Sequence, residues 1–250
     1  MATHQRGNDK KQQAGLTLIE LMVAMLIGLF LIGGVVQIFI STKQTYRLQE
    51  NLSRVQENGR FAMNFIGKDL RRADFRACPA ENPSVPNAVT GANDAGANAS
   101  DTVTVTWSTS ACAPAALVTQ TVTYFIQAAT NPQNDVNGLA TYFSLFKSIN
   151  GGLPQELIEG IENMQILYGV DTPLPTYDGS ANYYVPINNV NVLGTDRIVS
   201  VRISLLAATP DDNVASQPLT YLYNGVPITP VDRRVRRVFT STISLRNRLP

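Results

Sequence analysis

Histidine is nearly absent from this sequence, and its scarcity excludes several kinds of catalysis. His4 is the only histidine, and it lies in an N-terminal segment that we predict to be removed. Without it, Ser-His-Asp and Cys-His nucleophilic schemes and ordinary zinc sites are excluded. No GxxxxGK[ST] or GxGxxG phosphate-binding motif occurs. We therefore expect no enzyme activity and no cofactor, and keep a membrane-anchored enzyme only as the contrasting hypothesis.

The sequence also lacks an excess of charge of either sign, because the formal net charge of the 250 residues is only +1. This balance makes nucleic acid an improbable partner. It hides an asymmetry, since residues 1–15 hold Arg6, Lys10 and Lys11 against Asp9. An apolar run, residues 16–40, follows this basic segment and contains only Thr17, Glu20 and Gln37 as polar side chains.

As a helix, the run would extend about 37 Å, enough for one membrane span. It is too long for the apolar core of a cleaved secretory signal. Basic residues before a span stay cytoplasmic, so the rest of the chain should lie in the periplasm. Cys78 and Cys112 both belong to that exported part, where we expect them to form a disulfide rather than two free thiols.

Glu20 is a costly residue in such a run unless it has a partner. If the chain is cut after Gly15, Leu16 becomes a new N-terminus and Glu20 becomes the fifth residue. Its carboxylate could then neutralise an N-terminal amine, on its own chain or on a neighbouring subunit. The alternative is a plain signal anchor with an unpaired glutamate.

The basic leader, Gly15 and "LTLIELMVAMLIG" together resemble the type IV prepilin signal. The resemblance implies cleavage after Gly15 by the prepilin peptidase, which also methylates the new N-terminal residue, Leu16. Leu16 departs from the usual phenylalanine but keeps the position apolar. Gly28, Gly33 and Gly34 fit either tight helix packing in the membrane or helix bending.

After the span, residues 41–77 are predicted to continue the helix up to Cys78-Pro79. Apolar residues recur at spacings of three and four, which indicates one buried helical face. These residues are Leu48, Leu52, Val55, Ala62, Phe65, Ile66 and Leu70.

The head, residues 78–250, is predicted to begin with a loop, 79–100, and to continue with six strand-like segments. These segments are residues 102–107, 117–127, 141–148, 161–170, 197–206 and 235–246. Residues 171–182 and 208–218 are rich in turn residues. The expected fold is α+β, with a long N-terminal helix packed on an antiparallel sheet.

Two internal segments narrow the resemblance. "QENGRFAMNFIGKDLRRADFRAC" (56–78) and "GIENMQILYGVDT" (160–172) resemble the PilW family of minor pilins, and "VSVRISLL" and the closing "LRNR" also fit. This resemblance implies the type IV pilin fold and a role in starting pilus assembly at the inner membrane, in a priming complex that sits at the pilus tip. The implied partners are other minor pilins, the major pilin, the assembly platform and a large tip adhesin. The nearest alternative is a J-type pseudopilin of type II secretion.

Other chemistry-bearing residues are interpreted mainly as structural. Five carboxylates are acid–base candidates only in a generic sense: Asp69, Glu156, Glu159, Glu162 and Asp171. Asp171 and Asp178 are weak calcium candidates, because their loop offers few further oxygen ligands. Tyr183, Tyr184, Tyr221 and Tyr223 fit sheet packing better than an interface.

The densest basic patch is Arg233, Arg234, Arg236 and Arg237. It could contact DNA or an acidic partner. The competing interpretation is a solvated face at the start of an edge strand, where charge opposes aggregation.

Overall fold

The fold was analysed in a computed structural model, which describes residues 15, 17–77, 87–109, 118–129, 142–173, 176–191 and 196–249. The chain divides into two compact units, Met1–Tyr46 and Arg47–Pro250, which are described separately. Helix α1 (Leu18–Leu70) supplies nearly all of the described part of the first unit and begins the second.

Helix α1 ends at Leu70, short of the predicted boundary at residue 77. After it, the N–H of Arg72 donates to the carbonyl of Asp69, and the N–H of Ala73 donates to that of Leu70. Asp74 then takes a positive φ of 57°, and its N–H donates to the carbonyl of Thr106. A left-handed residue tied to a strand cannot continue a right-handed helix, so absence of proline was not sufficient to extend it.

The amphipathic stripe within Arg47–Leu70 is largely as predicted. Val55, Ala62, Ile66 and Leu70 are buried, which places them on the face that enters the core. Leu48 and Leu52 are only half-buried, and Phe65 keeps 46% of its surface exposed.

Two antiparallel sheets form the second unit, where the sequence predicted one. The five-stranded sheet has its strands in chain order: β1 (Val89–Ala92), β2 (Thr102–Ser108), β3 (Thr119–Ala128), β4 (Phe143–Ile149) and β5 (Gln155–Glu159). The four-stranded sheet has the order β11 (Arg236–Ser244), β8 (Arg197–Ala208), β6 (Ile161–Asp171) and β7 (Tyr183–Val185). A hairpin of β9 (Tyr221–Tyr223) and β10 (Val226–Ile228) accompanies them.

All six predicted strand segments coincide with strands, but five shorter strands were not predicted. The expected loop over residues 79–100 contains β1 and the short 3₁₀ helix Ala97–Ala99. Two more 3₁₀ helices, Ile187–Asn189 and Arg246–Arg248, complete the described elements.

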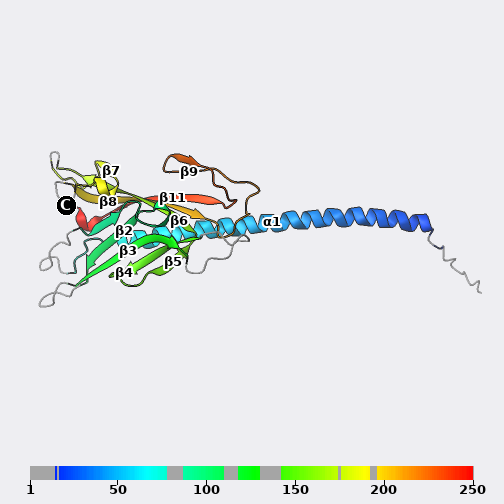
Figure 1. Cartoon of the computed structure of the whole chain (residues 1–250), viewed down its shortest axis with the longest axis horizontal. Coiled ribbons are helices and arrows are strands. Elements are labelled where there is room, and N and C mark those ends of the chain that lie inside the picture. The colour runs from blue at the N-terminus through cyan, green and yellow to red at the C-terminus, as the bar shows by residue number, and fades with distance from the viewer. Residues whose placement is uncertain are drawn as a thin grey trace, which may run out of the picture. The chain divides into compact units, whose positions relative to one another are not determined.

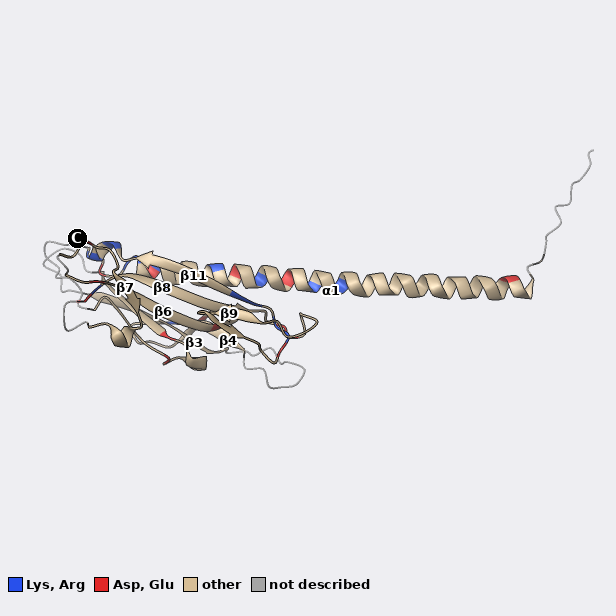
Figure 2. Ribbon diagram, turned by 90° about the horizontal axis from the view of Figure 1, so that it is seen from above, with Lys and Arg blue, Asp and Glu red and all other residues tan. Residues whose placement is uncertain are grey.

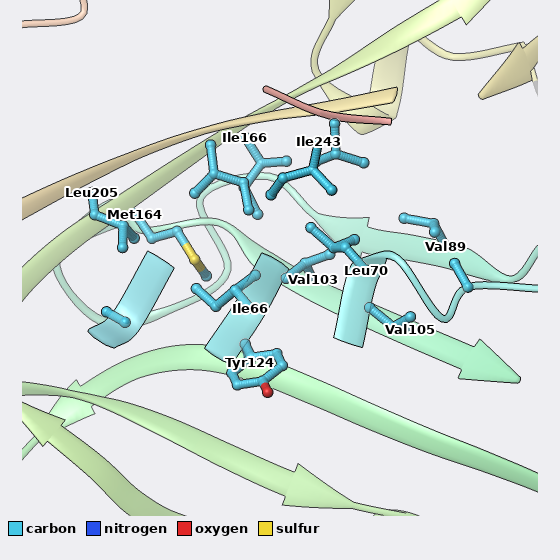
Figure 3. Close-up of a cluster of buried hydrophobic side chains, with 14 of the residues drawn as sticks. Ile66, Leu70, Val89, Val103, Val105, Tyr124, Met164, Ile166, Leu205 and Ile243 are labelled. Carbon is cyan, nitrogen blue, oxygen red and sulfur yellow. The ribbon is translucent and has the colours of Figure 1, made fainter. Parts of the chain in front are cut away.

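The core lies where the C-terminal part of α1 passes between the two sheets (Figure 1, Figure 3). Ile66 and Leu70 project from the helix, Val103 and Tyr124 come from one sheet, and Ile166 comes from the other. Burying each such side chain contributes about 1.5–3 kcal/mol. The helix therefore forms the middle layer of the head, and both sheets depend on it for their apolar contacts.

Strand β2 shows how sequence alternation produces this layering. Val103, Val105 and Trp107 alternate toward the core and are buried. The hydroxyls of Thr104 and Thr106 instead bond to threonines of β3 at 2.9 and 3.1 Å. One face is thus set by apolar burial and the other by cross-strand hydrogen bonds.

Candidate assembly surfaces

The apolar half of α1 is uncovered within the chain. Its large apolar side chains from Leu18 to Ile40 are between 45% and 79% exposed. The helix carries no Lys, Arg, Asp or Glu between Glu20 and Lys43 (Figure 2). Among the described residues it is the one helix long and apolar enough to cross a membrane. A surface of this kind requires lipid or other apolar helices around it.

Glu20 lies in the first turn of α1, where its negative charge suits the positive end of the helix dipole. The backbone N–H of Glu20 donates a hydrogen bond to the Thr17 hydroxyl at 3.4 Å. No described cation pairs with the Glu20 carboxylate. Leu16, whose amine is the expected partner, lies outside the described residues, so the pairing stays a prediction.

Gly28, Gly33 and Gly34 have open space around them. A Cβ added at any of these positions would have no atom of another part of the chain within 4 Å. The helix runs through all three without interruption. Contacts within the chain therefore do not require glycine at these positions. Close packing against other helices and bending of the helix both stay hypotheses for them.

The four arginines do not form one exposed basic patch. The Arg236 guanidinium makes a bidentate pair with Glu162, at 2.6 and 2.9 Å, and also bonds to both carboxylate oxygens of Asp232. Arg234 is buried, and its guanidinium stacks on Tyr142. Arg233 bonds to Asn213, so Arg237 is the member left exposed without a described partner.

The Arg236 cluster is an internal brace between strands rather than a binding surface. Burial alone would lower the pKa of Arg236, but its hydrogen bonds to Asp232 and Glu162 raise that pKa above its usual value. The same bonds from Arg236 lower the pKa of Asp232. Because its guanidinium is bonded to both carboxylates, Arg236 is not available to a nucleic-acid backbone. Arg234 is not available either, because it is buried.

Asp171 is the last residue of β6 and Asp178 follows it in the chain, and their described hydrogen bonds are to backbone N–H groups. The N–H of Gly179 donates to Asp171 Oδ2 at 2.8 Å, and the N–H of Ser180 donates to Asp178 Oδ1 at 2.8 Å. No group of three or more His, Cys, Asp or Glu residues suited to a metal occurs in the described part of the chain. These contacts explain the two aspartates as loop-closing residues.

Comparison with known proteins agrees with this geometry. Residues 123–247, half of the chain, match the model of the family described as type IV pilus-assembly protein W, PilW. The chain belongs to the PilW family. Residues 10–36 match the prokaryotic N-terminal methylation motif. No curated protein matches this sequence.

Among solved structures, a type IV-like pilin from Thermus thermophilus is similar, at 14% sequence identity and a TM-score of 0.43. The match covers 79% of this chain and 99% of that one.

Membership of the PilW family makes this chain a membrane-anchored type IV minor pilin that works with other pilus components. Residues 1–14 of the predicted leader (1–15), the methylation site Leu16, and Cys78 and Cys112 all lie outside the described residues. Cleavage, methylation and the disulfide therefore stay predictions.

The carboxylates of Asp69, Glu156 and Glu162 have structural partners. Asp69 accepts hydrogen bonds from Tyr124 and Lys147, and Glu156 accepts one from Ser144. Glu162 holds Arg236, while the backbone carbonyl of Glu159 accepts a bond from Asn58. The family and the fold are structural rather than enzymatic.

The four tyrosines are also anchored within the sheets. Tyr223 donates to Asn163 at 2.8 Å, Tyr184 bonds to Ser200 at 3.1 Å and Tyr183 donates to Asp196 at 3.2 Å. Tyr221 lies against the Arg236 guanidinium. These contacts fit sheet packing, which the sequence favoured over an interface for these tyrosines.

Sequence reasoning missed a groove between α1 and β11. Arg60 and Gly67 line it from α1, Arg71 lines it just after the helix ends, and Phe239 and Ile243 line it from the strand. Arg60 was visible in the sequence as part of the polar face of the helix. The arginines near residue 236 indicated an edge strand, but nothing in the sequence indicated that this strand would lie beside α1.

Proposed function

We propose that this protein is a minor pilin that helps to start type IV pilus assembly. In this function it joins other minor pilins in a priming complex on the inner-membrane assembly platform. The complex recruits the major pilin and remains at the pilus tip, where it can carry a large adhesin. The prepilin peptidase cleaves after Gly15 and methylates Leu16, and the head is periplasmic.

The observation that carries this proposal is the uncovered apolar helix with one early carboxylate. The large apolar side chains of Leu18–Ile40 are exposed, so we expect lipid to surround this segment before assembly and pilin helices to surround it afterwards. Glu20 has no described cation partner within the chain, which leaves it available to an N-terminal amine. Any membrane anchor needs an uncovered apolar helix, but the anchor of an enzyme does not need a carboxylate near its start.

The first test is a count of surface pili in a strain lacking this gene, with and without the ability to retract pili. We expect pili to disappear and to return only partly when retraction is blocked. Unchanged pili in both backgrounds would contradict a priming role and would make a type II secretion pseudopilin the better account. Secretion assays on the same strains would then identify that alternative.

The second test concerns Glu20. We expect Glu20→Ala to be cleaved normally but to enter pili poorly, because the amine loses its counter-charge in the membrane. Glu57→Ala is the matched control, since Glu57 is an exposed glutamate farther along the same helix. Normal incorporation of the Glu20 variant would refute the amine pairing.

A further inference from the structure

Strand β11 is the one long open edge of the described sheets. It pairs only with β8, over nine residues and with no break in register. The other outer strands are shorter: β7 has three residues, β1 has four and β5 has five. Strand β11 contains no proline, lysine or bulge, which are common protections of an edge.

The hydrogen bonds at its two ends show which backbone groups are free. The N–H of Thr209 donates to the carbonyl of Val235 at 2.9 Å, and the N–H of Leu245 donates to that of Val199 at 2.8 Å. In an antiparallel ladder, hydrogen-bonded pairs alternate with open pairs. Odd-numbered residues of β11 therefore bond to β8. Val238, Thr240 and Thr242 direct their N–H and carbonyl groups outward, without a described backbone partner.

A groove runs along this strand, between it and α1. Its volume is about 310 Å³, and Met63 and Ile243 supply apolar surface. Arg60 and Arg71 are its only charged lining residues. Both are exposed, and neither forms an ion pair with a described residue. The groove is therefore cationic and lacks an internal counter-charge. Figure 2 shows β11 outermost in its sheet, alongside α1.

The spacing of the two arginines matches a strand. They are eleven positions apart, Arg60 on α1 and Arg71 one residue past its end, where the Arg71 N–H still donates to the carbonyl of Gly67. At about 1.5 Å per residue this corresponds to about 16 Å. An extended chain covers that distance in about five residues, at about 3.3 Å each. Two carboxylates on one face of a strand must be an even number of positions apart, so a spacing of four or six fits.

We propose that the edge of β11 binds an extended acidic segment of a partner pilin by strand addition. The outward N–H and carbonyl groups of Val238, Thr240 and Thr242 pair with the incoming backbone. Arg60 and Arg71 select carboxylates four or six positions apart in that segment. This inference rests on the proposed function, because it specifies the kind of contact that a priming complex makes.

The test measures fluorescence anisotropy of labelled peptides with the full chain in detergent micelles. One ten-residue peptide alternates valine and threonine and has glutamates six positions apart. Its control has lysines in place of the glutamates. We expect the glutamate peptide to bind at least tenfold more tightly at low salt, and the difference to shrink in high salt. Absence of saturable binding, or equal binding of the two peptides, would overturn the proposal.

Paired variants separate backbone pairing from side-chain effects. Thr240→Pro with Thr242→Pro removes two outward N–H groups and leaves the bonds to β8 in place. We expect this variant to lose at least tenfold in affinity, whereas Thr240→Ala with Thr242→Ala should bind normally. Arg60→Glu with Arg71→Glu should reverse the peptide preference. Circular dichroism verifies that each variant is folded.

Two outcomes would count against the acidic partner. The first is unchanged binding by the proline variant, since this variant removes two of the three outward N–H groups that strand addition would use. The second is self-association of the chain, abolished by the same prolines, which would make a second copy the occupant. Because peptide binding is measured without pili, its failure is distinguishable from a failure of the priming function.

Discussion

Replacing Asp69 by alanine should loosen the attachment of α1 to the five-stranded sheet. The buried Asp69 carboxylate accepts a hydrogen bond from the Tyr124 hydroxyl at 2.7 Å and one from Lys147 Nζ at 2.9 Å. Tyr124 on β3 and Lys147 on β4 are opposite each other in the sheet register. One helical carboxylate therefore fixes two neighbouring strands. Its loss leaves Lys147 without this acceptor and leaves the Tyr124 hydroxyl only the carbonyl of Phe65, at 3.4 Å.

The expected loss of stability follows from the burial of the three groups. Hydrogen bonds to a charged group contribute about 1.5–3 kcal/mol, and removing one member of a fully buried ion pair costs about 3–5 kcal/mol. Lys147 retains 20% side-chain exposure, so water can partly solvate its ammonium group. We therefore expect Asp69→Ala to lower the free energy of unfolding by about 2–4 kcal/mol.

Trp107 is a natural probe for the measurement, because it is the only tryptophan and is buried. Urea unfolding of the full chain in detergent micelles can be followed by its fluorescence and by circular dichroism. With a slope of about 2 kcal/mol per molar urea, the midpoint should fall by about 1–2 M. Lys68→Ala is the control, since Lys68 is an exposed neighbour and should change stability by less than about 0.5 kcal/mol.

A double-mutant cycle with Lys147→Met tests the reasoning directly. Since both side chains act through one contact, the two losses should not add. A change below about 0.5 kcal/mol for Asp69→Ala, or additive losses, would show that the carboxylate does not hold the helix in place.

Three further predictions concern packing and charge. Gly59→Ala should lower the free energy of unfolding by about 1–3 kcal/mol, because the added Cβ would overlap the Phe239 ring. Adding Phe239→Leu should restore part of this stability. Unchanged stability of the single variant would refute the clash. Arg236→Met should cost about 3–5 kcal/mol by leaving Glu162 unpaired, and urea unfolding should show a smaller cost in a Glu162→Gln background. An equal cost in both backgrounds would contradict the pairing. Stability should fall above pH of about 10, because the unfolded state ionises its tyrosines while burial holds their pKa values higher in the fold. Titration by absorbance and unfolding at pH 8–11 checks this, and a flat profile would contradict it. The tyrosines concerned are Tyr124, Tyr142, Tyr168 and Tyr223.

The sequence predicted elements well where a periodic pattern was long. The helix and the six longer strands each present enough turns or alternations for one face to be distinguished. Strands β7, β9 and β10 have three residues each, which is too few to show a period of two. Strand β5, with the sequence QELIE, contains no alternation and is a strand because β4 pairs with it.

Partners of charged residues could not be predicted, because they depend on tertiary register. Asp69 and Lys147 are 78 positions apart, and Glu162 and Arg236 are 74 apart. A shift of one residue in the strand would turn either partner to the opposite face. The sequence shows that these residues are charged, but only the folded structure shows that Asp69 pairs with Lys147 and Glu162 with Arg236.

The β11 edge shows how a correct local interpretation can still hide a surface. Arginines at the start of a strand indicated a protected edge, and β11 is indeed an edge. Arg236, however, is committed inward to Glu162 and Asp232, so only Arg237 is left to guard the strand. From Val238 to Ser244 the edge carries no charge at all. An unguarded edge of this length favours aggregation unless it is covered, and a pilin is exposed to crowded neighbours throughout assembly. The strand addition proposed above would cover this edge.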